Sequence, residues 1–125
     1  MIGYVTLGTN DLEKAAGFYD ALAKEMNAGR LMESDRFVGW GRSMDRPLLM
    51  VFIPHDGKPA TVGNGVMVAL QADSPAEVDR LFARAIELGA TSDGDPGARG
   101  GDFYGAYFRD LDGNKLNFFC FTGTG

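Results

Sequence analysis

The chain has 125 residues, of which 45% are hydrophobic and 23% are charged, which is typical of one globular domain with a single core. Its net charge of −5 is spread over scattered acidic and basic residues, so neither nucleic acid nor an anionic membrane is an expected partner. One cysteine excludes an intramolecular disulfide, and no apolar segment is long enough to predict a membrane span or a signal sequence. We therefore expect a cytoplasmic protein.

The first half of the chain predicts a strand, a helix and three further strands. Residues 2–8 alternate polar and apolar side chains, as a strand does. Asn10 and Glu13 have the spacing of a capping box, and Asn27 is suited to end the helix that they begin. The apolar stripe of this helix consists of Leu12, Ala15, Ala16, Tyr19, Leu22, Ala23 and Met26. Short strands are then expected over residues 29–33, 36–42 and 47–53.

The second half begins in the same way. Residues 66–72 alternate as a strand, and Ser74 with Glu77 forms a capping box that has Pro75 at the first helical position. The helix ends at Gly89. Its apolar side consists of Val78, Leu81, Phe82, Ala85 and Leu88.

The chain closes on a predicted β-hairpin. A short strand is expected near residues 90–92, before a segment rich in Gly and Asp. Residues 104–121 then form two alternating runs, and Asp112-Gly113 between them predicts a tight turn, because Gly adopts the positive φ that such turns need.

Strand, helix and three strands therefore occur twice, as an internal repeat. The predicted fold class is α+β, with two βαβββ modules in a single domain over residues 1–125. The first module covers residues 1–56 approximately, a linker covers 57–64, and the second module covers 65–125. Each half has too little apolar surface to be stable alone. We expect the half-sheets to combine, within one chain or across a dimer, into a curved mixed sheet with the helices on its outer side.

Three segments carry a family resemblance. Residues 4–14 read YVTLGTNDLEK, residues 65–70 read GVMVAL and residues 109–117 read RDLDGNKLN. Together they resemble the signatures of the vicinal oxygen chelate (VOC) superfamily, which includes glyoxalases, bleomycin-resistance proteins and extradiol dioxygenases. The resemblance covers nearly the whole chain. It implies the glyoxalase/bleomycin-resistance/dihydroxybiphenyl dioxygenase fold, and it implies a homodimer.

The resemblance also implies a divalent metal ion in a cleft, held by four side chains from the first and last strands of the two modules. Those positions fall on Tyr4, on Leu49 or Met50, on Met67 and on Asn117. None of them is a His, Asp or Glu, whereas zinc, nickel and manganese sites need imidazole, thiolate or carboxylate ligands. We therefore predict no metal and no cofactor at this position.

Strand alternation predicts which side chains face away from the helices. On that side we expect Tyr4, Thr6, Met67, Ala69, Gln71, Asn117 and Phe119, and beneath the helices Val5, Leu7, Val66, Val68, Leu70, Leu116 and Phe118. The mixture of polar and apolar groups suits a small pocket for an organic ligand, or else a filled sheet interior with satisfied polar groups. The predicted ligand-binding residues are Tyr4, Thr6, Trp40, Met50, Met67, Gln71, Asn117 and Phe119. Trp40 is suited equally to a stacking wall and to a structural or dimer contact.

The candidate catalytic residues are His55, Tyr4 and Arg99. His55 is either a solvated turn residue or an acid–base group, and with Asp56 or Asp102 it could build a different metal site. Arg99 is either a solvated loop residue or a clamp for a carboxylate or phosphate.

Three functions are compatible with these features. The first is a metal-independent protein that binds a small organic molecule. It either sequesters its ligand, as in the bleomycin-resistance branch, or binds an unknown metabolite. The second is a lyase or isomerase related to the glyoxalases, with a rearranged or metal-free active site. The third is a subunit whose sheet supplies only an interface. Our prediction is the first, because the metal positions have lost their ligands while polar groups remain on the same side of the sheet.

Overall fold

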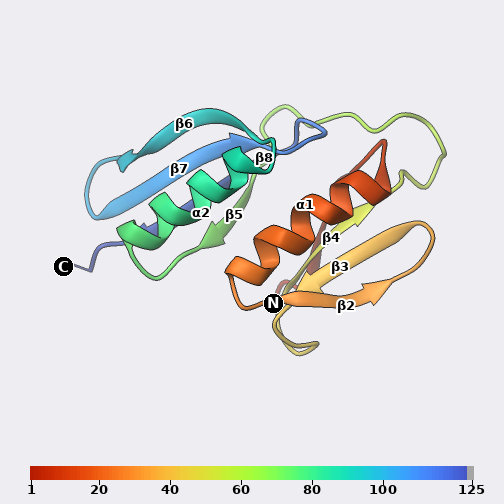
Figure 1. Cartoon of the computed structure of the whole chain (residues 1–125), viewed down its shortest axis with the longest axis horizontal. Helices are drawn as coiled ribbons and strands as arrows, with labels where there is room; N and C mark the ends of the chain where they lie inside the picture. The colour runs from red at the N-terminus through yellow and green to blue at the C-terminus, as the bar shows by residue number, and fades with distance from the viewer. Residues whose placement is uncertain (124–125) are drawn as a thin grey trace. The chain divides into compact units, whose positions relative to one another are not determined.

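The computed structural model describes residues 1–123, and the chain divides into two compact units with the boundary between Val62 and Gly63. Each unit consists of one helix and a four-stranded sheet, in the order strand, helix, strand, strand, strand (Figure 1). The prediction of an α+β fold with two βαβββ modules is confirmed. We call residues 1–62 the first module and the residues from 63 onward the second module. Among the described residues, no helix is long and apolar enough to cross a membrane.

The first module contains β1 (Tyr4–Gly8), α1 (Leu12–Glu25), β2 (Gly29–Glu33), β3 (Phe37–Gly41) and β4 (Leu48–Phe52). The strand order in its sheet is β1-β4-β3-β2. The pairing of β1 with β4 is parallel, and the other two pairings are antiparallel, so the sheet is mixed.

The second module contains β5 (Val68–Gln71), α2 (Pro75–Glu87), β6 (Thr91–Ala98), β7 (Phe103–Arg109) and β8 (Lys115–Phe121). Its strand order, β5-β8-β7-β6, repeats the pattern of the first module. Again only the pairing that involves the first strand of the module, β5 with β8, is parallel.

The first helix begins one residue later than the sequence predicts. Asp11 is the N-cap, and its Oδ1 accepts from the main-chain N–H of Lys14 at 3.1 Å. Asn10 instead bonds Ala60 in the segment after β4, with its Oδ1 accepting from the Ala60 N–H at 2.6 Å and its Nδ2 donating to the Ala60 carbonyl at 3.3 Å. Asn10 is therefore a tether for that segment, and the prediction that it caps the helix is wrong.

The other helix boundaries agree with the prediction. Ser74 caps α2, because its Oγ accepts from the main-chain N–H of Glu77 at 3.2 Å. Asn27 has a φ of 57° and Gly89 a φ of 110°, which are the left-handed conformations expected just after a helix.

Each module has its core between its helix and one face of its sheet. In the first module, the buried side chains on α1 are Ala15, Ala16, Phe18, Tyr19 and Leu22, and those on the strands beneath include Leu7, Val38, Trp40 and Val51. In the second module, they are Val78, Leu81, Phe82 and Ala85 on α2 and Ala106, Phe108, Leu116, Phe118 and Cys120 on the strands.

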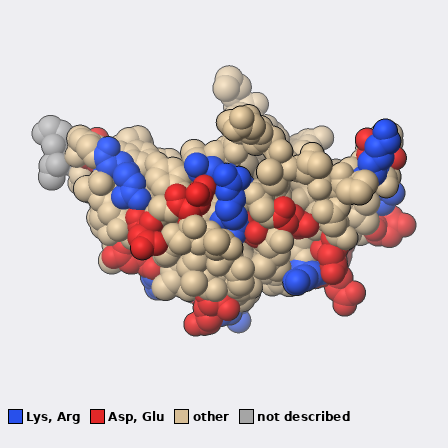
Figure 2. Space-filling view, turned by 90° about the horizontal axis from the view of Figure 1, so that it is seen from above, with Lys and Arg blue, Asp and Glu red and all other residues tan. Residues whose placement is uncertain are grey.

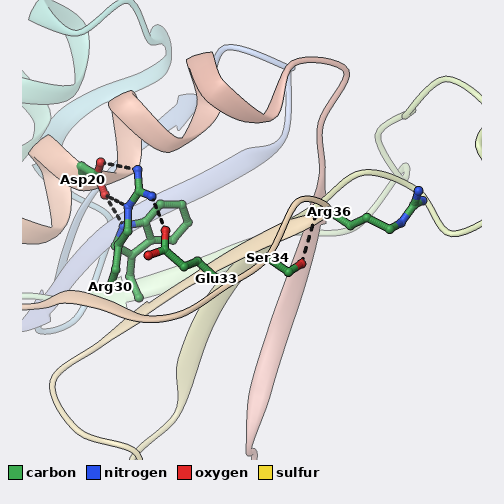
Figure 3. A network of polar contacts seen from close by, with 6 residues as sticks. Asp20, Arg30, Glu33, Ser34 and Arg36 are labelled. Atoms are coloured by element: carbon green, nitrogen blue, oxygen red, sulfur yellow. Dashed lines mark hydrogen bonds and ion pairs between the residues drawn. The ribbon is translucent and has the colours of Figure 1, made fainter.

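A polar network joins α1 to β2 and β3 in the first module (Figure 3). The Arg30 guanidinium donates to both carboxylate oxygens of Asp20, at 2.8 and 2.7 Å, and to Glu33 at 2.7 Å. The indole N–H of Trp40 also donates to the Asp20 carboxylate, at 2.8 Å. Trp40 also packs against Tyr19, with ring centroids 5.3 Å apart. Trp40 is therefore a core residue on the helix side of the sheet.

This network adds a small, pH-dependent contribution to the stability of the first module. The hydrogen bonds from Arg30 hold the pKa of Asp20 below its ordinary value of 3.8, and the Trp40 hydrogen bond acts in the same direction, whereas burial opposes them. Because the folded-state pKa is the lower one, this stabilisation is complete above the unfolded pKa and is lost as the pH falls through the folded value. The Asp20 and Arg30 side chains are 42% and 39% exposed, so solvent screening keeps the effect small. We expect the melting temperature to fall less between about pH 6 and about pH 3 in Asp20→Asn than in the wild type. Equal falls would contradict this assignment.

The hairpin differs from the prediction in its turn. The last pair of the ladder is Arg109 with Lys115, so five residues, 110–114, connect β7 to β8 in place of a two-residue turn. Gly113 has a φ of 90°. Asp110 is buried, and its Oδ1 accepts from the main-chain N–H groups of Asp112 and Asn114, both at 2.9 Å. The loop is therefore organised around this one carboxylate.

The strand β6 is longer than the sequence indicates. It covers eight residues in place of the three expected near residues 90–92. Its register with β7 shifts twice, between Ser92 and Gly94 and between Gly94 and Gly97. The strand is at the edge of its sheet and includes Pro96.

Charged side chains of both signs lie next to one another on the face that Figure 2 shows. This agrees with the scattered pattern of charge in the sequence.

Candidate functional site

Each sheet has one face beneath its helix and one face turned away from it, which we call the open face. In the first module the strand register places on the open face Tyr4, Thr6, Phe37, Gly39, Leu48, Met50 and Phe52. Met50 pairs with Thr6, whereas Leu49 pairs with Val5 and Trp40 on the helix side. Of the two alternatives for the end of the first module, Met50 is therefore the residue that shares a face with Tyr4.

The open face of the first module is largely apolar. Tyr4 is 61% exposed and Thr6 is exposed. Met50 is buried, and its side chain lies over Gly39, where an added side-chain carbon would be 3.0 Å from the Met50 Cγ. The rings of Phe37 and Phe52 stack with centroids 4.9 Å apart.

In the second module, two rows of residues cross the open face of the sheet. One row runs from Ala69 through Asn117 to Tyr107, and the next from Gln71 through Phe119 to Gly105. The predicted positions of Asn117, Phe119, Gln71 and Ala69 on this side agree with the register. Tyr107 and Gly105 join them from β7, which the sequence did not indicate.

Asn117 lies at the centre of this face and is 1% exposed. Its Nδ2 donates to the main-chain carbonyl of Phe118 at 3.0 Å. A side-chain carbon at Gly105 would lie 3.2 Å from that nitrogen and 2.8 Å from the Phe103 ring. The missing side chain of Gly105 therefore lets the Asn117 amide and the Phe103 ring approach each other.

Aromatic rings cover one end of the face. The rings of Phe103 and Phe119 are parallel within 4°, with centroids 5.6 Å apart. Phe121 meets both of them edge-on, at 5.9 and 5.7 Å. Phe103 and Phe119 are half-buried, so part of each ring remains accessible.

Cations cover the other end. The Arg99 guanidinium carbon lies 5.5 Å from the centre of the Tyr107 ring, and the Lys115 ammonium lies 5.4 Å from it, both within the range of cation–π attraction. Lys115 and Arg109 both pair with Asp93, at 3.4 and 3.2 Å.

Two glycines make room for Arg99. A side-chain carbon at Gly97 would lie 2.9 Å from the Arg99 Nη1, and one at Gly94 would lie 3.4 Å from Nη2. Arg99 also donates to the main-chain carbonyl of Asp95. The guanidinium is therefore laid back over β6, on the same side as Tyr107.

Several predicted positions differ from the structure. Trp40 lies beneath α1 and not on the open face. Met67 and Val66 precede β5 and are exposed, at 42% and 58%, so Val66 does not pack beneath a helix as expected. By contrast, His55 is exposed in the turn after β4, which agrees with the alternative of a solvated turn residue.

The donor groups do not fit the divalent metal that the resemblance implies. The four positions carry a phenol, two thioethers and an amide, from Tyr4, Met50, Met67 and Asn117, and such groups are poor ligands for zinc, nickel or manganese. In the described part of the chain there is also no group of three or more His, Cys, Asp or Glu side chains that could hold a metal ion.

Comparison with known proteins identifies the family. The family model of the Glyoxalase/Bleomycin resistance protein/Dioxygenase superfamily matches residues 1–118. A glyoxalase/bleomycin resistance protein from Albidiferax ferrireducens T118 is 34% identical, with a TM-score of 0.87, over 96% of this chain and 98% of that one. A hypothetical protein from S. aureus is 28% identical, with a TM-score of 0.75, over 96% and 92%.

A lactoylglutathione lyase from Agrobacterium tumefaciens is 21% identical, with a TM-score of 0.73, over 100% of this chain and 96% of that one, which shows a shared fold alone. No protein of curated function matches the chain. The family model covers nearly the whole chain, and the Albidiferax relative matches it at 34% identity. The chain therefore belongs to the glyoxalase/bleomycin resistance protein/dioxygenase superfamily.

Proposed function

We propose that the protein binds a small organic molecule on the open side of its sheets without the help of a metal ion. The observation that carries this proposal is the donor set at the family's metal positions, which offers no imidazole and no carboxylate. The open faces still carry hydroxyl, amide and aromatic groups in an apolar setting, which is the usual composition of a site for an organic ligand. The role is sequestration, as in the bleomycin-resistance branch, or binding of a metabolite.

The ligand-binding residues in this proposal are Tyr4, Thr6 and Met50 on the first module and Gln71, Asn117 and Phe119 on the second, with Met67 beside β5. Trp40 is left out because its indole is committed to Asp20 and Tyr19. We further propose that the protein acts in the cytoplasm as a homodimer.

Metal content tests the proposal most directly. Protein purified without chelator, and again after incubation with zinc, nickel, manganese or iron, is expected to contain far less than one metal ion per chain by elemental analysis. A true site would retain a stoichiometric ion through gel filtration. His55→Ala is the matched control, because any weak binding by the single imidazole would disappear in this variant. Stoichiometric metal in both proteins would overturn the proposal.

The alternative function is a lyase or isomerase of the glyoxalase kind. The family membership supports it, but fold does not by itself imply an activity. Its test is turnover of the hemithioacetal of methylglyoxal and glutathione, measured with and without chelator. Turnover that survives chelation and disappears in His55→Ala, with an unchanged melting temperature, would establish a metal-free enzyme and replace the binding role.

A further inference from the structure

We propose that the open face of the second module binds a flat aromatic carboxylate, with Arg99 as the partner of the carboxylate group and the Phe103 and Phe119 rings as the surface against which the aromatic ring packs. The inference rests on the proposed binding function and specifies the chemical class of its ligand. All the groups that it uses belong to β6, β7, β8 and the segment that follows β6.

The first observation is a cation that has no carboxylate partner. Among residues 1–123, no Asp or Glu side chain forms an ion pair with Arg99, whereas Lys115 and Arg109 share Asp93. The guanidinium is nevertheless held in place by the Asp95 carbonyl and the Tyr107 ring. A fixed guanidinium with donors to spare matches the two oxygens of a carboxylate.

The second observation is that the cation and the aromatic rings share one row of the sheet. Arg99 lies over Gly97, and Gly97 pairs with Gly105, over which the edge of the Phe103 ring lies. Gly105 in turn pairs with Phe119. Neighbouring strands are about 4.8 Å apart, so the guanidinium over Gly97 and the Phe103 ring over Gly105 are separated by roughly one strand spacing, and Phe119 is one strand further on. A molecule with a carboxylate attached directly to one aromatic ring has the size to contact both the Arg99 guanidinium and the aromatic rings of the sheet.

The third observation is the polar group between the two ends. The Asn117 amide is next to Tyr107 in the neighbouring row and is close to Phe103. Its nitrogen already donates to the Phe118 carbonyl, so its carbonyl oxygen is the part suited to accept from a hydroxyl or amine on the ligand.

The charged side chains at this end of the sheet favour a ligand with a negative charge. Arg99, Lys115 and Arg109 gather at this end of the sheet, against the carboxylates of Asp93 and Asp95, in a chain whose net charge is −5. A cationic ligand would be repelled by the unpaired Arg99, whereas an anion gains from it without the need to break an existing ion pair.

Benzoate is the first probe, titrated into the full chain in the presence of EDTA and followed by calorimetry and by amide chemical shifts. We expect binding, with shifts at Gly94, Gly97, Gly105 and the Asn117 side-chain amide. Benzamide, which lacks the charge, and cyclohexanecarboxylate, which lacks the aromatic ring, should each bind at least about tenfold more weakly, because each loses one interaction of roughly 1.4 kcal/mol or more. Inorganic phosphate keeps an anion for Arg99 but has no ring, so it should be weakened by at least the same factor, and equal binding of phosphate would overturn the aromatic part.

Arg99→Gln should weaken benzoate binding by about ten- to a hundredfold, as expected for loss of a hydrogen-bonded charge. The matched control is Arg36→Gln. Arg36 is also an exposed arginine whose guanidinium donates to a main-chain carbonyl, that of Pro54 at 2.8 Å, but it belongs to the first module. It should leave the affinity unchanged. Both variants should retain the wild-type circular dichroism spectrum.

Each outcome decides one claim. If benzamide binds as tightly as benzoate, or if the Arg99→Gln variant binds benzoate with wild-type affinity, the claim that the ligand is an anion is overturned. Metal-independent binding is left intact by either result. Cyclohexanecarboxylate that binds equally overturns the aromatic part. Benzoate that binds only when zinc or nickel replaces EDTA overturns the proposed metal independence but supports the ligand class. No binding of any probe at millimolar concentration overturns the ligand class, and the metal analysis then judges the proposed function separately.

Discussion

Phe118→Ala is expected to destabilise the protein by about 3–5 kcal/mol, the range measured when a large buried aromatic side chain is truncated. Phe118 is 0% exposed and stacks on Phe108 with centroids 4.9 Å apart, beneath α2. Its removal loses the transfer free energy of the ring and leaves a cavity that the rigid sheet can fill only in part. Because small domains are stable by only about 5–15 kcal/mol, the variant should unfold at much lower urea concentration. Urea titration followed by far-ultraviolet circular dichroism measures the shift.

Phe121→Ala is the control for this prediction, because it removes the same side chain from the same strand. Phe121 is 58% exposed and on the open face. Its ring pairs with Phe103 and Phe119 are edge-on, and more than half of the side chain is exposed, so the expected loss is within about 1 kcal/mol. If the two variants lost similar stability, the assignment of β8 faces to core and open side would be wrong.

Asp110→Ala should also cost several kcal/mol, because one buried carboxylate organises the β7–β8 loop. Besides the two main-chain donors, the Asn114 Nδ2 donates to the other carboxylate oxygen at 3.1 Å. Alanine would remove this acceptor from the three donors in a largely buried loop, at about 1–3 kcal/mol for each donor that water cannot reach. Chemical denaturation measures the loss, and amide exchange at Gly113 and Asn114 should accelerate with it.

Asp110→Asn separates the hydrogen bonds from the rest of the side chain. The asparagine carbonyl oxygen can still accept from both main-chain N–H groups, whereas the contact with the Asn114 amide has to rearrange. We expect less than about half of the loss seen with alanine. An equal loss in the two variants would show that the negative charge, and not the acceptor, stabilises the loop.

The alternation of residues predicted most of the fold because it does not depend on distant contacts. Leu116 and Phe118 alternate with Asn117 and Phe119, and the structure places the first pair beneath α2 and the second on the open face. In the same way, Ser74 and Glu77 are close in sequence, so the cap that they form could be predicted without knowledge of the rest of the chain.

The register of the hairpin could not be predicted in this way. A two-residue turn at Asp112-Gly113 would pair Phe108 with Asn117, whereas the observed five-residue loop pairs Tyr107 with Asn117. A slip of one residue turns every side chain of β7 to the other face. The buried contacts of Asp110 select the longer loop, and only that loop places Tyr107 beside Arg99 and Lys115.

The side of the sheet on which Trp40 lies could not be predicted from the sequence either, for a different reason. The strand Phe37–Gly41 reads Phe-Val-Gly-Trp-Gly, and its alternation does not say which side faces the helix. The side is decided by Asp20, twenty residues earlier on α1, whose carboxylate receives the indole N–H. Long-range hydrogen bonds of this kind leave no local pattern. The position of Arg99 is equally hidden, because it depends on glycines 94 and 97 and on Tyr107 together.

The irregular β6 also bears on how the protein behaves at high concentration. An exposed edge strand offers a row of unpaired main-chain groups to which another chain can add, and this is a common start of aggregation. In β6 the proline lacks an N–H, and the two shifts in register disturb the straight ladder that an added strand would need. This edge of the second module is therefore a poor template for fibrous self-association, and replacing Pro96 alone should leave most of that protection in place.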